Sequence, residues 1–212
     1  MAMSKRALKR ALCPHCERPV KTCLCDDIVT LKCAYQLIIL QDPTEAKHAL
    51  SSSPILAKSI DDTRLIIGEI FDPYELLGED WQQQSLLVFP SESSLSGAQA
   101  AQLTFKYVIL LDGTWRKVSR LLHLNPWLTQ IPSIAIQATR ASEYKIRKTP
   151  REDGLSTIEA AVETLNSLEP NKDFSPILNA FHKMIDFQIH AMGIDKFKNN
   201  YLKVHNKVNL KK

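Results

Sequence analysis

Short apolar runs recur along the chain, and each is followed by a polar turn before the pattern changes to helical spacing. Continuous apolar runs predict strands that are covered on both faces of a sheet. We expect such strands at residues 34–40, 63–67, 86–89, 107–111 and 131–136. Helices are expected up to Ser59 with a break near Pro54, over 97–103, after Trp115, from Ser156, and over 174–197. Strands that alternate with helices are typical of an α/β fold with a mostly parallel sheet.

The most informative of these runs covers residues 107–122. An apolar strand pattern ends at Asp112, Gly113 and Thr114, and an amphipathic basic helix pattern follows. Ligands of open α/β sheets bind in the crevice beyond the carboxyl ends of the strands. The sequence therefore predicts a ligand-binding site at that point, which offers an acid, a glycine, a hydroxyl and Trp115. The alternative is that Asp112 only caps the helix and Trp115 only fills core.

A chain of 212 residues is long enough for one substantial hydrophobic core and a small additional unit. The formal net charge of +4 permits an anionic partner without requiring one. No apolar run is long enough to cross a bilayer, and the basic start lacks the apolar segment of a secretory signal. We therefore expect a cytoplasmic protein with no membrane partner.

Four cysteines lie close together near the start of the chain, as a C-x-x-C pair and a C-x-C pair: Cys13, Cys16, Cys23 and Cys25. Four soft ligands at this spacing predict a tetrahedral structural zinc site closed to substrate. Disulfides are disfavoured without a secretion signal, and a redox C-x-x-C would need a following helix, which Pro14 opposes. An iron–sulfur cluster uses the same ligands at other spacings.

A basic stretch precedes the expected helix at Ser156 and contains Lys145, Arg147, Lys148 and Arg151. It is either a solvated loop or a phosphate-binding segment. Ser156 or Thr157 suits the N-cap of the following helix, and Glu159 could close a capping box with Ser156. The basic tail, residues 198–212, could fray or contact RNA.

These patterns together resemble the DTW-domain family in its bacterial form. Asp112-Gly113-Thr114-Trp115 resembles the Asp-x-Thr-Trp signature, and residues 144–148 and 155–160 are similar to its Tyr-x-x-Arg-Lys and Leu-Ser-Thr-x-Glu-Ala pattern. The cysteine set, Pro43 with Glu45, and the turn at residues 89–91 also match. Asp42 stands where the family usually has histidine. Pro90 is equally consistent with a simple strand-to-loop corner.

The resemblance implies a tRNA-uridine aminocarboxypropyltransferase. Such an enzyme transfers the 3-amino-3-carboxypropyl group of S-adenosylmethionine to N3 of a uridine in tRNA and releases methylthioadenosine. It further implies a SPOUT-like α/β sheet flanked by helices, whose C-terminal part can thread a knot around the substrate. We expect a monomer with a four-cysteine zinc-binding unit at residues 1–27, a catalytic domain at 33–197 and the tail at 198–212.

The same resemblance assigns roles to individual residues. Asp112 is the expected catalytic residue. The residues expected to bind S-adenosylmethionine are Phe89, Pro90, Ser91, Leu110, Leu111, Gly113, Thr114, Trp115, Ser156, Thr157 and Glu159. The residues expected to contact RNA are Arg116, Lys117, Arg120, Lys145, Arg147, Lys148 and Arg151.

Two rival functions remain at this stage. One is an S-adenosylmethionine-dependent RNA methyltransferase of SPOUT type, which differs only in the carbon that is transferred. The other is a non-catalytic zinc-ribbon RNA-binding protein, which would leave the strand–DGTW–helix turn without a role. No Walker loop, GxGxxG string or His-Glu-x-x-His element points to other chemistry.

Overall fold

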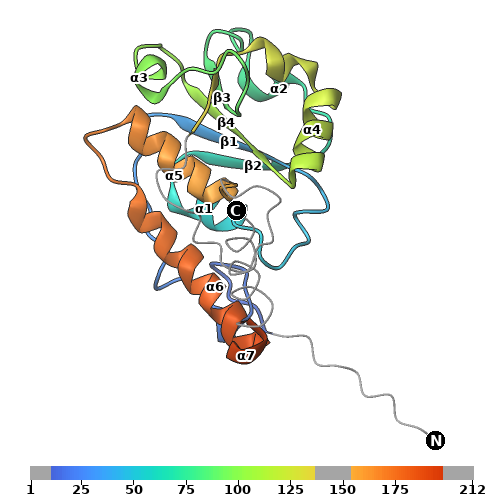
Figure 1. Cartoon of the computed structure of the whole chain (residues 1–212), viewed down its shortest axis with the longest axis vertical. Coiled ribbons are helices and arrows are strands. Elements are labelled where there is room, and N and C mark those ends of the chain that lie inside the picture. Colours follow the sequence, from blue (N-terminus) through green and yellow to red (C-terminus); the bar gives the residue numbers. More distant parts are fainter. Residues whose placement is uncertain (1–10, 137–153, 198–212) are drawn as a thin grey trace, which may run out of the picture.

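A sheet of five parallel strands forms the centre of the computed structural model, which describes residues 11–136 and 154–197. The strands lie in the order β2-β1-β4-β3-β5, and Figure 1 shows β2, β1, β4 and β3 side by side. Their bounds are β1 Gln36–Gln41, β2 Thr63–Ile67, β3 Ser85–Val88, β4 Tyr107–Asp112 and β5 Ser133–Ile134. The expected α/β fold with a parallel sheet is thereby confirmed.

Helices cover both faces of this sheet, as Figure 1 shows. One face packs against α1 (Ser53–Ser59), α5 (Thr157–Leu168) and α6 (Leu178–Met192). The other face packs against α2 (Pro73–Leu77), α4 (Trp115–Leu124) and the 3-10 helix η2 (Pro126–Gln130). Because strand side chains alternate, Leu37 and Ile39 of β1 enter the first core, and Ile38 and Leu40 enter the second.

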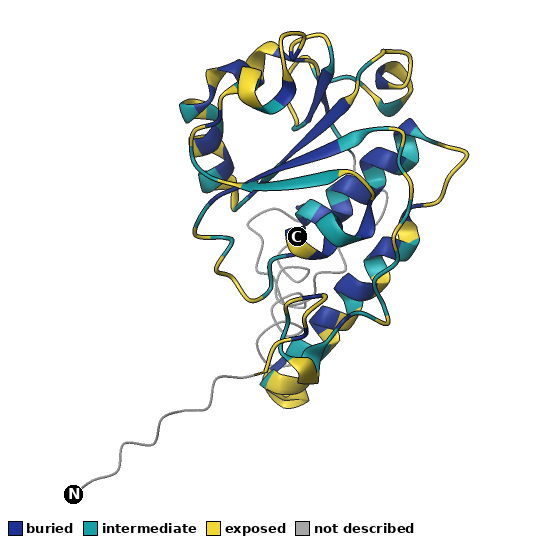
Figure 2. Ribbon diagram, turned by 180° about the vertical axis from the view of Figure 1, so that it is seen from behind, coloured by how far each residue is buried: buried dark blue, intermediate teal, exposed yellow. Residues whose placement is uncertain are grey.

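The remaining helices are short. They are η1 (Val20–Thr22), α3 (Gly97–Ala100), η3 (Ser175–Ile177) and α7 (Ile194–Phe197). Figure 2 shows the central strands as largely buried, whereas α7 is largely exposed. Among the described helices, none is long and apolar enough to cross a membrane.

Several element boundaries differ from those expected from the sequence. Pro54 lies in the first turn of α1, so it starts that helix instead of breaking it. Gly193, with φ of 89°, separates α6 from α7 within the single helix expected over 174–197. At the sheet edge, β5 is limited to two residues. The sequence reading missed α2 and η2, which are short and lack a clear helical stripe.

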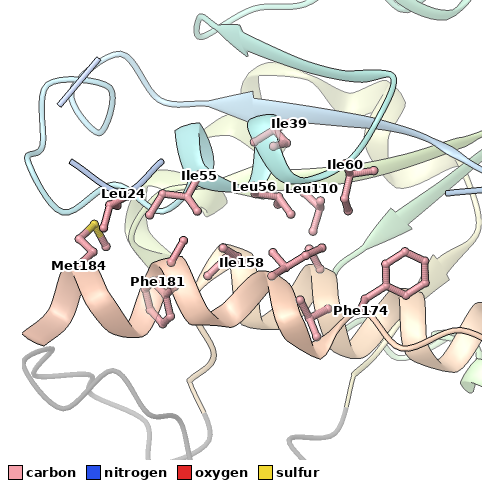
Figure 3. Close-up of a cluster of buried hydrophobic side chains, with 14 of the residues drawn as sticks. Leu24, Ile39, Ile55, Leu56, Ile60, Leu110, Ile158, Phe174, Phe181 and Met184 are labelled. Carbon is pink, nitrogen blue, oxygen red and sulfur yellow. The ribbon is translucent and has the colours of Figure 1, made fainter. Parts of the chain in front are cut away.

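The cysteine-containing segment packs onto the main core through Leu24. This side chain is fully buried beside α1 and α6, where Figure 3 shows it near Ile55 and Met184. Arg18 reinforces the attachment, since its Nη1 donates to the backbone oxygen of Ala49 at 3.4 Å. The segment before the boundary expected near residue 27 is therefore packed onto the main core.

Candidate active site and metal site

A cavity of about 200 Å³ lies at the carboxyl edge of the sheet, between the ends of β3 and β4 and the start of α5. This is the edge at which parallel α/β sheets bind ligands. Most of the residues in its wall are apolar, and two of them are aromatic, Phe89 and Trp115. The lining residues are Val88, Phe89, Pro90, Leu110, Leu111, Gly113, Trp115, Val118, Ile134, Ile136, Leu155, Ser156, Thr157 and Ala160.

Most residues expected to bind S-adenosylmethionine line this cavity. They are Phe89, Pro90, Leu110, Leu111, Gly113, Trp115, Ser156 and Thr157. The structure places Ser91, Thr114 and Glu159 near the cavity but outside its lining. Ile136 and Leu155, which the sequence reading missed, both line it and flank residues 137–153, which lie outside the described ranges. The knot expected of the C-terminal part stays a prediction.

Asp112 lies behind the cavity wall, and its side chain is held by two neutral donors. Thr157 Oγ1 donates to Asp112 Oδ1 at 2.5 Å, and Gln41 Nε2 donates to Asp112 Oδ2 at 2.6 Å. Gln41 and Asp112 are direct partners in the β1–β4 register. Asp112 is 8% exposed, and its neighbours Leu111, Gly113 and Thr157 form the adjacent wall.

A second group of polar side chains lies beside Gly113, after the end of β1. Lys117 Nζ is 2.7 Å from Glu45 Oε1 and 4.0 Å from Asp42 Oδ1. Asp42 Oδ1 also accepts hydrogen bonds from the backbone and hydroxyl of Thr44. Burial raises the pKa of Asp42, but the Thr44 hydrogen bonds and the Lys117 charge together bring that pKa below its usual value.

Gly113 leaves almost no room for a side chain between this polar group and the cavity. A Cβ built at position 113 would lie 3.1 Å from Lys117 Cβ and 3.8 Å from Asp42 Cβ. The residue lets the chain pass closely from β4 into α4. Thr114 is the N-cap residue of α4, and its side chain makes no capping hydrogen bond.

Two aromatic rings flank the cavity. The rings of Phe89 and Trp115 have centroids 6.2 Å apart and are inclined at 57°. Trp115 is 38% exposed, so the alternative that it fills core is wrong. The faces of such rings are suited to contact a cation or a planar base.

The turn after β3 is held by a cluster of serine hydroxyls. Ser91 Oγ lies 2.8 Å from Ser133 Oγ, and Ser94 Oγ lies 3.1 Å from the same atom. Ser94 Oγ also donates to the backbone oxygen of Phe89 at 3.2 Å. Ser91 therefore fixes the turn that carries Phe89 and Pro90 into the cavity wall.

The start of α5 is fixed by the capping box that the sequence predicts. Ser156 Oγ accepts from the backbone of Glu159, whose carboxylate accepts from the backbone of Ser156 at 2.7 Å. Glu159 is buried and is oriented toward Ser156. This local arrangement holds Thr157, the first residue of α5, against Asp112.

The residues expected to contact RNA fall into three groups. Arg116 is exposed on α4, beside Trp115. Lys117 pairs with Glu45, and Arg120 Nη1 pairs with Glu69 Oε1 at 2.9 Å on the surface. Lys145, Arg147, Lys148 and Arg151 lie outside the described ranges, as does the tail.

The four N-terminal cysteines form a compact cluster that could hold a metal ion. Their sulfurs all lie within 4.8 Å of one another, with 3.5 Å between Cys13 and Cys25 and 3.6 Å between Cys16 and Cys23. Sulfurs about 2.3 Å from a tetrahedral zinc ion are separated by about 3.8 Å, so the donor set and its spacing fit zinc. The backbone amides of Cys16 and His15 lower the pKa of the Cys13 thiol to about 6.

Comparisons with known proteins agree with the site. Curated proteins named tRNA-uridine aminocarboxypropyltransferase 2 from Drosophila melanogaster and Macaca fascicularis are 27% and 29% identical to this chain. Each alignment covers 93% of this chain, and they cover 83% and 70% of the two relatives. A protein named tRNA-uridine aminocarboxypropyltransferase A from Arabidopsis thaliana is 23% identical over 85% of this chain and 81% of its own length.

No solved structure gives a significant match to the chain. The family model described as the DTW domain matches residues 10–189, which include the cysteine cluster and every described residue of the cavity wall. The chain therefore belongs to the DTW domain family.

Proposed function

We propose that this protein transfers the 3-amino-3-carboxypropyl group of S-adenosylmethionine to N3 of a uridine in tRNA, with release of methylthioadenosine. The observation that carries the proposal is the cavity at the end of β4. Gly113 and the exposed Trp115 line this cavity, and the Asp112 carboxylate lies directly behind its wall. The names of the relatives supply the reaction class. We further propose that the protein acts as a monomer.

The cavity offers different surroundings to the parts of S-adenosylmethionine. Its apolar walls suit the adenosine portion, and the rings of Phe89 and Trp115 provide faces that attract the sulfonium charge. The backbone amides at the start of α4 and the Thr114 hydroxyl are donors for the carboxylate of the methionine portion. Binding in this direction would point the γ-carbon toward the uridine.

Transfer requires N3 of uridine to lose its proton as it forms a bond to the γ-carbon. The sulfur–carbon bond breaks and its electron pair remains on sulfur, which gives neutral methylthioadenosine. Asp112 is the base in this scheme, because its carboxylate lies directly behind the wall formed by Leu111, Gly113 and Thr157 and accepts two hydrogen bonds from neutral donors. A positioned general base typically accelerates such a step by about 10²–10⁴-fold.

Two further parts of the protein support this reaction from a distance. Arg116 is exposed next to Trp115, which supports a contact of its guanidinium with a tRNA phosphate in the proposed complex. The Cys13, Cys16, Cys23 and Cys25 cluster would hold a structural zinc ion that stabilises the segment packed through Leu24. With four protein ligands, that ion would have no position open to substrate.

The test is mass spectrometry of nucleosides from unmodified tRNA incubated with the protein and S-adenosylmethionine. We expect a uridine that gains an aminocarboxypropyl group, and loss of this product with Asp112→Asn. Circular dichroism and S-adenosylmethionine affinity of the variant serve as controls for its fold. A methyl gain would replace the proposal with a methyltransferase, and bound tRNA without any product would replace it with a binding protein.

A further inference from the structure

We propose that Thr157 is a catalytic residue that accepts the N3 proton of uridine and passes its own proton to Asp112, while Gln41 positions the Asp112 carboxylate. This inference rests on the proposed function and assigns the route of the proton within it. It makes the base a pair of residues from β4 and α5 instead of a single acid.

Position in the cavity is the first argument for Thr157. Thr157 lines the cavity, whereas Asp112 is 8% exposed and lies behind the lining. The hydroxyl of Thr157 is thus the part of the pair that bound substrate meets first. The carboxylate is the partner of this hydroxyl, with 2.5 Å between Thr157 Oγ1 and Asp112 Oδ1.

Hydrogen-bond capacity is the second argument. A threonine hydroxyl has one proton and two lone pairs, and its proton is donated to Asp112 Oδ1. Its lone pairs therefore remain to accept an N–H from a ligand in the cavity. Because a short hydrogen bond to a carboxylate polarises the hydroxyl, the oxygen becomes a better acceptor.

Gln41 fixes the other oxygen of the carboxylate. Its Nε2 donates to Asp112 Oδ2 at 2.6 Å and to Ser51 Oγ at 2.9 Å, so both amide protons are used. Gln41 is 1% exposed and is the register partner of Asp112, so the backbone ladder sets its position. This arrangement turns Oδ1 toward Thr157.

The charges around Asp112 leave its carboxylate available as an acceptor. Asp42 and Glu45 follow β1, and Lys117 on α4 is paired with these two residues. On α5, the buried Glu159 is directed to Ser156. Within the described ranges, no lysine or arginine forms an ion pair with Asp112.

The step balances as a transfer of two protons. The N3 electron pair forms the bond to the γ-carbon, and the bond from that carbon to sulfur breaks with its electrons left on sulfur. The N3 proton moves to Thr157 Oγ1 as the hydroxyl proton moves to Asp112 Oδ1. Thr157 ends the step as a hydroxyl again, and Asp112 ends it as a neutral acid that later releases its proton to water.

The first test compares Thr157→Val with Thr157→Ser in single-turnover reactions. Valine keeps the shape of threonine without a hydroxyl, so we expect the transfer rate to fall by about 10²–10³-fold, with serine within about tenfold of the wild type. S-adenosylmethionine affinity, measured by calorimetry, should change little in either variant. Equal rates for Thr157→Val and the wild type would overturn the relay, as would an equal loss in both variants.

The number of protons transferred in the rate-limiting step is a second readout, and a merely structural role of Thr157 would not change it. Transfer rates measured in mixtures of H₂O and D₂O should depend on the deuterium fraction with upward-concave curvature in the wild type, because two protons move in one step. A straight dependence would mean that Asp112 takes the proton directly. Failure of the wild type to form product would instead reject the proposed function itself.

Gln41 is tested through the pH dependence of the same rate. Gln41→Glu would place a second carboxyl group beside Asp112, so the two groups would share a proton and the pKa of the pair would rise. We expect the acid limb of the pH–rate profile to move to higher pH by at least one unit with Gln41→Glu. Gln41→Met removes a donor from the carboxylate, so it should lower the rate and move the limb in the same direction by a smaller amount. Profiles that superimpose on the wild type in both variants would remove Gln41 from the proposal.

Discussion

Lys117 Nζ lies 2.7 Å from Glu45 Oε1, across the gap between α4 and the loop that follows β1. Both side chains are partly buried, with 26% and 20% of their surfaces exposed. The pair therefore joins the helix that begins at the DTW turn to the neighbouring strand end. The ion pair also engages the charge of Lys117, which the sequence pattern predicts to contact RNA phosphates.

Breaking this pair should lower the free energy of unfolding. Lys117→Met leaves Glu45 and Asp42 without their cation, and we expect a loss of about 1 kcal/mol because water partly screens the site. A double-mutant cycle with Glu45→Gln, measured by urea unfolding, should give a coupling free energy of similar size. Strictly additive effects would mean that the two groups do not interact in solution.

Arg116 should affect tRNA binding more than Lys117 does. Its side chain is exposed beside Trp115, whereas the Lys117 charge is already paired. We expect Arg116→Met to weaken binding and to reduce the slope of log affinity against log salt by about one unit. Filter binding at several salt concentrations measures both quantities, and Lys106→Met, which removes an exposed cation just before the amino end of β4, is the surface control. Equal slopes for the Arg116 variant and the wild type would place Arg116 away from phosphate.

Stability should fall in acid because of Asp42. The Thr44 hydrogen bonds and Lys117 keep the pKa of folded Asp42 below its unfolded value of about 3.9, despite the opposing effect of burial. Its contribution is therefore complete above that unfolded value and is lost as pH falls toward the folded pKa. Between pH 6 and 3, the free energy of unfolding in urea should decline less steeply for Asp42→Asn than for the wild type. Parallel declines would contradict this role.

A methyl group at position 113 should disturb the site more than the fold. Its Cβ would lie 3.1 Å from Lys117 Cβ, which must move by a few tenths of an ångström. We expect Gly113→Ala to retain a cooperative unfolding transition but to bind S-adenosylmethionine at least tenfold more weakly. Gly97→Ala is the contrasting control, because its Cβ would meet Ser167 Cβ at 2.8 Å and cost about 1–3 kcal/mol of stability. Unchanged affinity in the Gly113 variant would show that the cavity tolerates the shift.

Removal of the metal should destabilise more than the cysteine segment itself. Leu24 is fully buried with Ile55 and Met184, so loosening the segment would expose part of the main core. We expect a chelator or Cys16→Ser to lower the melting temperature and to release one zinc ion per chain. His15→Ala changes an exposed residue between the ligands and should leave both measurements unaltered. A protein that contains no zinc, or melts identically after chelation, would exclude this role.

Local patterns in the sequence predicted the parts of the site that depend on neighbouring residues. The β4 run and the polar turn after it located Asp112 and Trp115, and the spacing from Ser156 to Glu159 gave the capping box. The four cysteines were recognisable because a short loop brings them together. The β2 segment was also predicted at its observed bounds, Thr63–Ile67.

Contacts between distant segments were not predictable in the same way. Gln41 appeared only as a polar residue at the end of an expected strand, and its hydrogen bond to Asp112 depends on the order and register of β1 and β4. Thr157 was assigned to substrate binding because nothing in its own segment shows that it meets Asp112. Lys117 looked like a surface cation, since its pairing with Glu45 depends on how α4 lies across the sheet. Tertiary packing decides each of these contacts.

The three-way contact among Gln41, Asp112 and Thr157 has a consequence during synthesis of the protein. Gln41 and Thr157 lie 71 and 45 residues from Asp112 along the chain. A nascent chain that has emerged only as far as β5 can pair β1 with β4, but it lacks the hydroxyl that α5 supplies. Under the proton route proposed above, the site is complete only after α5 has left the ribosome and packed, so a shorter nascent chain would lack the group that accepts the N3 proton.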